Sequence, residues 1–173
     1  KEINAHPQWK NASEQEIDNA REGIEKYVMT KLYNKVFSPT IEDVNIDNEI
    51  SIRLSMFAKK LQPHHLDIDP NLVDDNLATA ADSNLSGQVL LAISELRKIN
   101  TYKTPRDKMI CVSNCCKIIF NMLTIYYPKE HASADSFLPV MIYMVMKANP
   151  PHLHSNLKYV QEFRNPDKLI SEA

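Results

Sequence analysis

The sequence predicts an all-α protein, and three observations lead to this prediction. Apolar residues recur at the helical period in several separate segments. Helix start signals, such as the Thr104-Pro105 pair, stand at the beginning of some of these segments. Only two glycines, Gly23 and Gly87, occur among 173 residues, which disfavours the many tight turns of an all-β fold.

The first helix is predicted over residues 14–36. Ser13 and Glu16 have the spacing of a capping box, in which each side chain bonds the other residue's backbone N–H. Ser38-Pro39 follows and ends the helix. We expect its apolar stripe to face the core, and this stripe comprises Ile17, Ala20, Ile24, Val28 and Leu32.

The next part of the chain is predicted to alternate between connectors and helices. Residues 41–48 are read as an acidic connector, and residues 47–61 as a second helix that ends before Pro63. Residues 69–86 are rich in Asp, Asn, Ala and Ser without periodicity, so a mobile loop is expected there. A third helix over residues 86–100 follows.

A helix from Pro105 to about residue 124 is apolar on nearly all sides, so it should be central. Its three cysteines, Cys111, Cys115 and Cys116, are too clustered and odd in number for a disulfide framework, and they fit a reducing compartment. Cys111 and Cys115 share a helix face, as metal ligands would. No paired Cys/His set accompanies them, so we expect core residues without metal.

Residues 133–151 should form a buried helix with a charged tip. Ser133 or Asp135 can act as its N-cap, and the apolar run 137–146 is too short for a bilayer, which needs roughly 20 residues. Pro139 lacks the N–H that would bond the Asp135 carbonyl, so the first turn should be irregular. Asn149 precedes Pro150 and should leave the helical conformation. Further helices are predicted over residues 151–163, with Leu157 inward, and from residue 165.

Composition excludes several classes of function. The net charge is only −2, so no large basic field is present to hold nucleic acid or anionic lipid. With two glycines, the chain has neither of the glycine-rich loops that bind nucleotide phosphates, and we expect no cofactor.

The residues S-A-D-x-F-L-P-V-x-I-Y at 133–143, K-A-N-P-P at 147–151 and L-x-S-N-L-x-Y-V at 153–160 resemble the signature of the vacuolar protein sorting nine (Vps-nine) domain. T-P-R-D-K at 104–108, N-C-C at 114–116 and L-D-I at 66–68 extend the resemblance. It implies a Vps-nine-type helical domain over residues 49–173, truncated at its C-terminus. Residues 1–48 would be part of the helical bundle that packs on it.

The resemblance also implies a function. Vps-nine domains are guanine-nucleotide exchange factors for Rab GTPases, chiefly the early-endosomal Rab-five subfamily, and they change no covalent bond. Asp135 would be an acidic finger in the nucleotide site of the GTPase, although Ser136 stands where many relatives carry a second acid. Pro139 would border the Rab-binding groove, between the helix at 133–147 and the helix that follows residue 163. A tyrosine that the family uses in the next helix has no match here.

The expected partner is a Rab GTPase in its GDP-bound and nucleotide-free forms. We expect the protein to be cytoplasmic and peripherally recruited to early endosomes, without metal, nucleic acid or direct membrane insertion by this chain. The main alternative is an adaptor, and two hydrolase readings lack a nucleophile–base spacing in the sequence. Asp135 could be only a helix cap in an adaptor that binds a Rab protein without accelerating release. A hydrolase could use Asp135 with a histidine, or Cys111 with His131. Measured nucleotide release separates exchange factor from adaptor.

Overall fold

The structure is a computed structural model that describes residues 6–73, 83–128 and 133–171. Over these ranges the chain forms helices and no strand, so the all-α prediction is confirmed. The α-helices are α2 (Glu14–Val36), α3 (Ile41–Lys60), α4 (Ser83–Lys98), α5 (Pro105–Tyr126), α6 (Ala134–Ala148), α7 (Leu153–Phe163) and α8 (Pro166–Ser171). Short 3-10 turns occur at Pro7–Trp9, Pro63–Leu66 and Pro70–Leu72.

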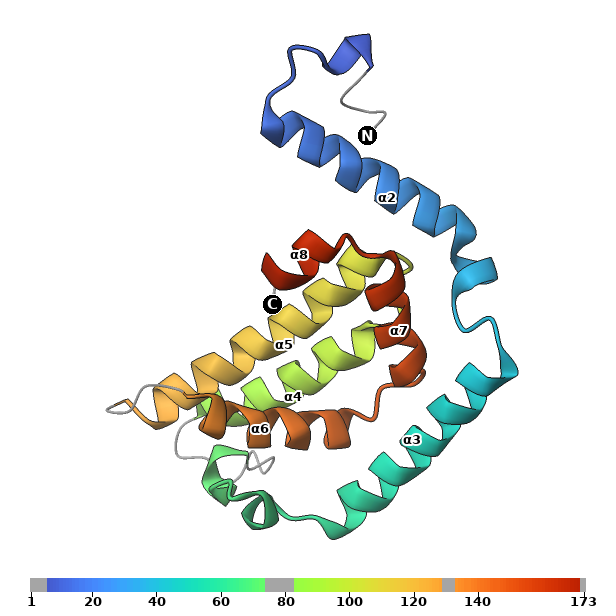
Figure 1. The fold of residues 1–173 in the computed structure, drawn as a ribbon. Coiled ribbons are helices and arrows are strands. Elements are labelled where there is room, and N and C mark those ends of the chain that lie inside the picture. Colours follow the sequence, from blue (N-terminus) through green and yellow to red (C-terminus); the bar gives the residue numbers. More distant parts are fainter. Residues whose placement is uncertain (1–5, 74–82, 129–132, 172–173) are drawn as a thin grey trace.

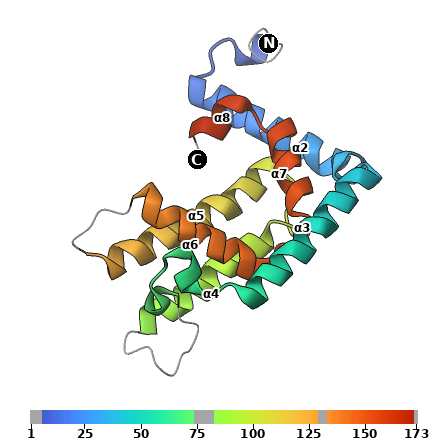
Figure 2. The same cartoon turned by 60° about the horizontal axis from the view of Figure 1, so that its bottom comes forward.

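The helix α5 lies at the centre and packs against α2, α4, α6 and α7. The helices α4 and α6 complete the main core, while α2 and α3 form an outer arm that runs around them (Figures 1 and 2). By length and composition α5 could also cross a membrane. The central helix of a folded domain can have the same length and composition. Because α5 packs against four other helices, we interpret it as a central helix of this kind.

The helix α2 begins as predicted, with the reciprocal Ser13–Glu16 capping box. Its orientation differs from the prediction, because the apolar stripe faces outward and Ile24 is 51% exposed. The opposite face carries Glu22 and Glu25, which accept hydrogen bonds of 2.9 and 3.0 Å from the buried guanidinium of Arg164. A guanidinium without access to water needs carboxylate partners, so the acidic face of α2 points inward.

Residues 41–48 are the first turns of α3, and the prediction of an acidic connector is wrong. Thr40 is the N-cap, and Asp43 closes a second capping box with it. The acidic residues suggested a solvated loop, yet Asp43 and Asp47 are buried. The predicted boundary between residues 48 and 49 falls within this helix, and the division of the chain into two domains stays a prediction.

The buried acids of α3 hold α7. His152, at the N-cap position of α7, has a left-handed backbone and its side chain does not cap the helix. Asp47 takes over this role, accepting a 3.1 Å bond from the backbone N–H of Ser155 and a 2.5 Å bond from its hydroxyl. One turn earlier, Asp43 accepts a 2.8 Å bond from Lys158. The start of α7 therefore depends on a cap from a distant segment of the chain.

Two further predictions need correction. The mobile loop expected over residues 69–86 includes buried Leu72 and Val73, and residues 83–86 already belong to α4. Residues 74–82 of that predicted loop lie outside the described residues. Leu157 of α7 was expected to face inward but is exposed, whereas Tyr159 and Val160 are buried.

The cysteines lie in and around the core, as expected. Cys111 and Cys115 are buried, and Cys116 is half-buried. Burial raises the pKa of the Cys115 thiol to about 12, so this side chain is a neutral apolar group at physiological pH. That the three bind no metal stays a prediction.

The ammonium group of Lys108 is fully buried and has no carboxylate partner among the described residues. It donates to the carbonyl of Ile99 at 2.9 Å and to the side-chain oxygen of Asn156 at 2.6 Å. Three rings surround it, those of Tyr33, Phe37 and Tyr159, with centroids at 5.2, 4.8 and 5.9 Å. Ring faces attract a cation, so this one group links α2, α5, α7 and the end of α4.

Replacing Asp47 by alanine should destabilise the protein by about 2 kcal/mol, because the cap of α7 is lost and buried donors of Ser155 lose their acceptor. Urea unfolding measures this change. The control is Glu49→Ala on the same helix, where an exposed ion pair with Arg53 is removed and a change below about 0.5 kcal/mol is expected. Equal losses in both variants would contradict the assigned role of Asp47.

The stability of the protein should depend on the titration of Lys108. Burial lowers the pKa of its ammonium group from 10.5 to about 8. Between these pH values the folded state has released the proton and the unfolded state still holds it, so rising pH favours folding. The unfolding free energy of the wild type, measured relative to that of Lys108→Met, should rise by up to about 3 kcal/mol between pH 8 and 10.5. A pH-independent difference would be inconsistent with a lowered pKa.

Candidate functional site

The tip of α6 is held by a serine pair. Ser133 is the N-cap, and its hydroxyl accepts a 3.3 Å bond from the backbone N–H of Ser136. The Ser136 hydroxyl in turn accepts a 3.0 Å bond from the N–H of Ser133. Ser136 therefore closes the capping box, and Asp135, the other predicted cap residue, is not needed for this purpose.

Asp135 lies in the first turn of α6 and is exposed. Within residues 6–73, 83–128 and 133–171, no side chain or backbone group forms a hydrogen bond or ion pair with its carboxylate. The first N–H groups of a helix carry partial positive charge, which favours an anion at this position. The carboxylate is thus presented to solvent on a firmly capped helix.

Three residues share a helix face with Asp135, at the i+3, i+4 and i+7 positions. They are Leu138, Pro139 and Ile142, and we call the four together the α6 stripe. Leu138 is 58% exposed, Ile142 is 42% exposed, and Pro139 is half-buried. Leu138 and Ile142 were not predicted to lie on the surface, although their helical spacing from Asp135 is a signal for it.

The opposite side of α6 fixes this stripe in place. Val140, Tyr143 and Met144 are buried in the main core. Phe137 stacks on Phe120 of α5, with ring centroids 4.5 Å apart and an interplanar angle of 15°. Close packing of this kind leaves a helix little freedom to rotate, so the stripe faces outward in a defined direction.

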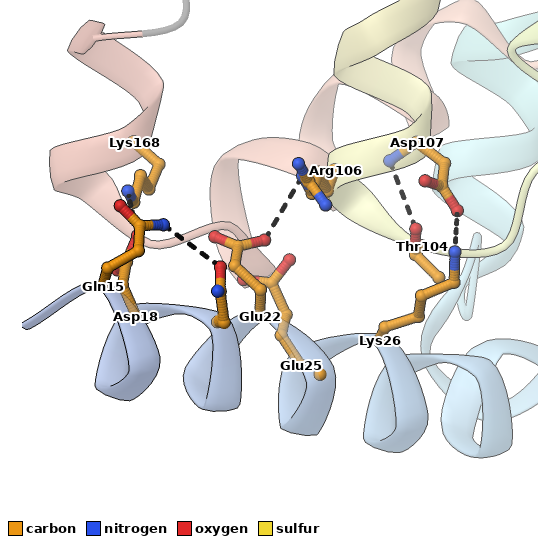
Figure 3. A pocket seen from close by; sticks show the side chains of 11 residues that line it. Gln15, Asp18, Glu22, Glu25, Lys26, Thr104, Arg106, Asp107 and Lys168 are labelled. Carbon is orange, nitrogen blue, oxygen red and sulfur yellow. Dashed lines mark hydrogen bonds and ion pairs between the residues drawn. The ribbon is translucent and has the colours of Figure 1, made fainter. Parts of the chain in front are cut away.

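The α6 stripe lies apart from a polar cavity that involves α2, α5 and α8. That cavity, of about 360 Å³, lies between α2, the start of α5 and α8 (Figure 3). Opposite charges line it in pairs: Lys26 with Asp107 at 3.3 Å, Arg106 with Glu22 at 3.5 Å, and Lys168 with Asp18 at 2.7 Å. Because these groups satisfy one another, we interpret the cavity as a seam that joins α2 to the rest of the fold.

The helix after residue 163, α8, was expected to flank a groove beside α6. In the structure, the ion pair between Lys168 and Asp18 holds α8 next to α2, near the beginning of α5 (Figures 1 and 3). The groove between α6 and α8 that was expected to bind a Rab protein stays a prediction. Two of the histidines, His152 and His154, lie near Asp47 and Asp43 of α3. His131, the other residue considered for a hydrolase, lies outside the described residues.

An exposed carboxylate followed by an apolar stripe can bind a partner in two ways at once. The apolar residues supply area that is removed from water on contact, and the carboxylate can pair with a cation in the partner's binding site. The α6 tip brings no nucleophile, base or metal-binding set together in the described chain. The arrangement is suited to macromolecular recognition.

Comparisons with known proteins give the family. The profile of the Vacuolar sorting protein 9 (VPS9) domain matches residues 89–173, and that of a Domain of unknown function (DUF5601) matches residues 1–33. Vacuolar protein sorting-associated protein 9A of Oryza sativa subsp. japonica is 46% identical over 172 residues, which cover 98% of this chain and 34% of that protein.

Two further relatives agree. Vacuolar protein sorting-associated protein 9A of Arabidopsis thaliana is 45% identical over 98% of this chain and 31% of that protein. The Rab5 GDP/GTP exchange factor of Homo sapiens is 36% identical over 90% of this chain and 30% of that protein. The chain thus spans about a third of the length of these relatives. The domain match, the relatives and the all-helical fold together show that residues 89–173 of this chain belong to the Vacuolar sorting protein 9 (VPS9) domain family.

Proposed function

We propose that this protein is a guanine-nucleotide exchange factor that accelerates GDP release from a Rab GTPase of the Rab5 type. The proposal is supported by the family and by the relative that is named a Rab5 GDP/GTP exchange factor. The structural observation that carries it is the exposed Asp135 carboxylate, which has no partner among the described residues and stands at the head of an apolar stripe.

The proposed mechanism is electrostatic. A GTPase of this kind holds its nucleotide with backbone N–H groups, a P-loop lysine and Mg²⁺, all of which stabilise negative charge. A carboxylate delivered there can pair with the lysine and repel the phosphates. The nucleotide-free complex is stabilised, GDP leaves faster, and no covalent bond of protein or nucleotide changes. Asp135 supplies the carboxylate in this proposal, and Pro139 contacts the GTPase within the α6 stripe.

Ser136 affects the proposed mechanism because it stands at the position where many relatives carry a second acid. The charge at the tip is lower than in a protein with two adjacent acids, while the capping box gives the first turn an additional bond. A capped first turn reduces the backbone freedom that is lost when Asp135 binds. We therefore assign the electrostatic role to Asp135 alone.

The partner would be met in both its GDP-bound and its nucleotide-free forms, and the site of action would be the cytoplasmic face of early endosomes after peripheral recruitment. The main alternative is an adaptor that binds a Rab protein without accelerating release. A panel of Rab proteins loaded with fluorescent GDP separates the two. An exchange factor increases the release rate of its preferred Rab, whereas an adaptor binds and leaves that rate unchanged.

The substitution Asp135→Asn in the full-length protein should lower the exchange rate roughly a hundredfold, because a charge-assisted contact worth a few kcal/mol is lost in a desolvated interface. The fold should be unaffected, since the exposed Asp135 has no partner among the described residues. GDP release and thermal melting are measured on the same protein samples.

The matched control for that experiment is Glu42→Gln, which removes an exposed acid from the first turn of α3. Its exchange rate should equal that of the wild type. Equal rates for the wild type and Asp135→Asn, both well above spontaneous release, would show that Asp135 plays no electrostatic role in exchange.

Truncation of the α6 stripe should weaken engagement of the GTPase. We expect Leu138→Ala to lower exchange efficiency about tenfold, as central apolar contacts of an interface do when truncated, with stability changed by less than about 0.5 kcal/mol. Leu90→Ala is the control, because Leu90 lies on α4 and is exposed to a similar extent, 51% against 58% for Leu138. If both variants lose activity equally, the stripe has no special role.

A further inference from the structure

The carbonyl groups at the C-terminal end of α6, opposite to Asp135, lack some of their usual backbone donors. The last carbonyl groups of a helix lack intrahelical donors, and the backbone that follows commonly supplies them. Here Pro150 and Pro151 follow, and a proline has no N–H to donate. Asn149 donates its N–H to the carbonyl of Val145, whereas the two prolines cannot donate to the carbonyls of Met146 and Lys147. In the structure, the carbonyls of Lys147 and Ala148 accept from a side chain of another helix.

Arg97 of α4 provides these donors. Its Nε donates to the carbonyl of Ala148 at 2.9 Å, and a terminal nitrogen donates to the carbonyl of Lys147 at 3.3 Å. The guanidinium also places a positive charge at the negative end of the α6 dipole. Arg97 is exposed on the surface, so both bonds can be removed without opening the core.

Amide side chains hold the turn that follows. Asn100 donates to the carbonyl of Pro151 at 2.6 Å, and Asn156 donates to the same carbonyl at 3.3 Å and to that of His152 at 2.8 Å. Asn156 also donates to the side-chain oxygen of Asn100 at 2.9 Å, and its own oxygen accepts from buried Lys108. The turn is thus tied to the central helix α5 through a continuous network.

A fourth contact comes from the outer arm. The side-chain nitrogen of Asn149 donates to the carbonyl of Ser51 at 3.2 Å and to the hydroxyl of Ser55 at 2.9 Å, both on α3. The C-terminal end of α6 and the turn after it are therefore held from α3, α4 and α7, and these contacts oppose movement of α6 along its own axis.

We infer that Arg97, Asn100 and Asn156 are positioning residues for nucleotide exchange. Arg97 holds the C-terminal end of α6, and the two asparagines hold the turn that follows it, so that together they set where Asp135 stands. This inference rests on the exchange activity proposed above. A helix is stiff along its axis, so a shift at residues 147–149 is passed to the first turn. A displacement of about 1 Å can cost up to a hundredfold in rate when a reacting group must be precisely placed.

The test uses Arg97→Ala and Asn100→Asp in the full-length protein. Both side chains lie at least partly in solvent, so the variants should fold. Asn100→Asp keeps the acceptor for Asn156 and loses the donor to Pro151. Arg53→Ala, which removes another exposed arginine, is the matched control.

Two measurements are made on each variant. Amide hydrogen exchange over residues 145–156, without any GTPase, should become at least tenfold faster in Arg97→Ala and Asn100→Asp and stay unchanged in the control. The maximal rate of GDP release at saturating GTPase should fall about tenfold. The half-saturating GTPase concentration should change less than the maximal rate, because the apolar contacts of Leu138 and Ile142 depend less on exact geometry than a charge-assisted bond of Asp135 does. Arg97→Lys keeps a cation at the helix end and should restore part of the maximal rate.

The outcomes are distinct. Loss of protection together with a lower maximal rate supports the inference. Unchanged amide protection overturns it, because the contacts then do not hold α6. Lost protection with a normal rate also overturns it, because the position of α6 then does not matter for exchange. If the wild type binds a Rab protein but releases no GDP, the proposed function fails first, and the positioning role fails with it.

Discussion

A positive charge that water cannot reach constrains much of this structure. The Lys108 ammonium lacks a carboxylate partner in the described chain, so its charge is stabilised by a carbonyl at the end of α4, an amide oxygen on α7 and aromatic rings from α2 and α7. Removing any one of these partners leaves a buried cation less well solvated. The relative positions of four elements are therefore linked, and through Asn156 the link reaches the turn behind α6. Tyr33 and Phe37 make the C-terminal part of α2 an integral part of this arrangement.

The fold bears on the proposed exchange activity because it holds the helix that carries Asp135 in place. An acidic residue can compete with a bound phosphate only if it is held in place before it meets its target, since ordering it during binding costs free energy. The α6 helix meets this requirement through its serine capping box, the stack of Phe137 on Phe120, and the clamp on residues 147–149. Between the two ends, buried side chains hold one face and leave Leu138 and Ile142 exposed on the other.

Much of the helical architecture could be predicted from the sequence, because local signals such as the Ser13–Glu16 pair and Thr104-Pro105 are sufficient to start a helix. Predictions failed where contacts with residues far away in the sequence decide which side chains are buried. The outward turn of the α2 apolar stripe depends on Arg164, and the burial of Asp43 and Asp47 depends on α7, neither of which a local pattern reveals. For the site, the sequence indicated Asp135 and Pro139, whose proposed roles rest on the family resemblance. The exposed neighbours emerged only when the core side of α6 was known.

The most direct test of the central claim is the structure of the full-length protein bound to a nucleotide-free Rab5-type GTPase. We predict that Leu138, Pro139 and Ile142 lie in the interface and that a carboxylate oxygen of Asp135 lies within hydrogen-bonding distance of the P-loop lysine. The backbone of residues 147–152 should keep the contacts to Arg97, Asn100 and Asn156 that it has here. A complex in which the GTPase binds another face, with Asp135 left in solvent, would contradict the account.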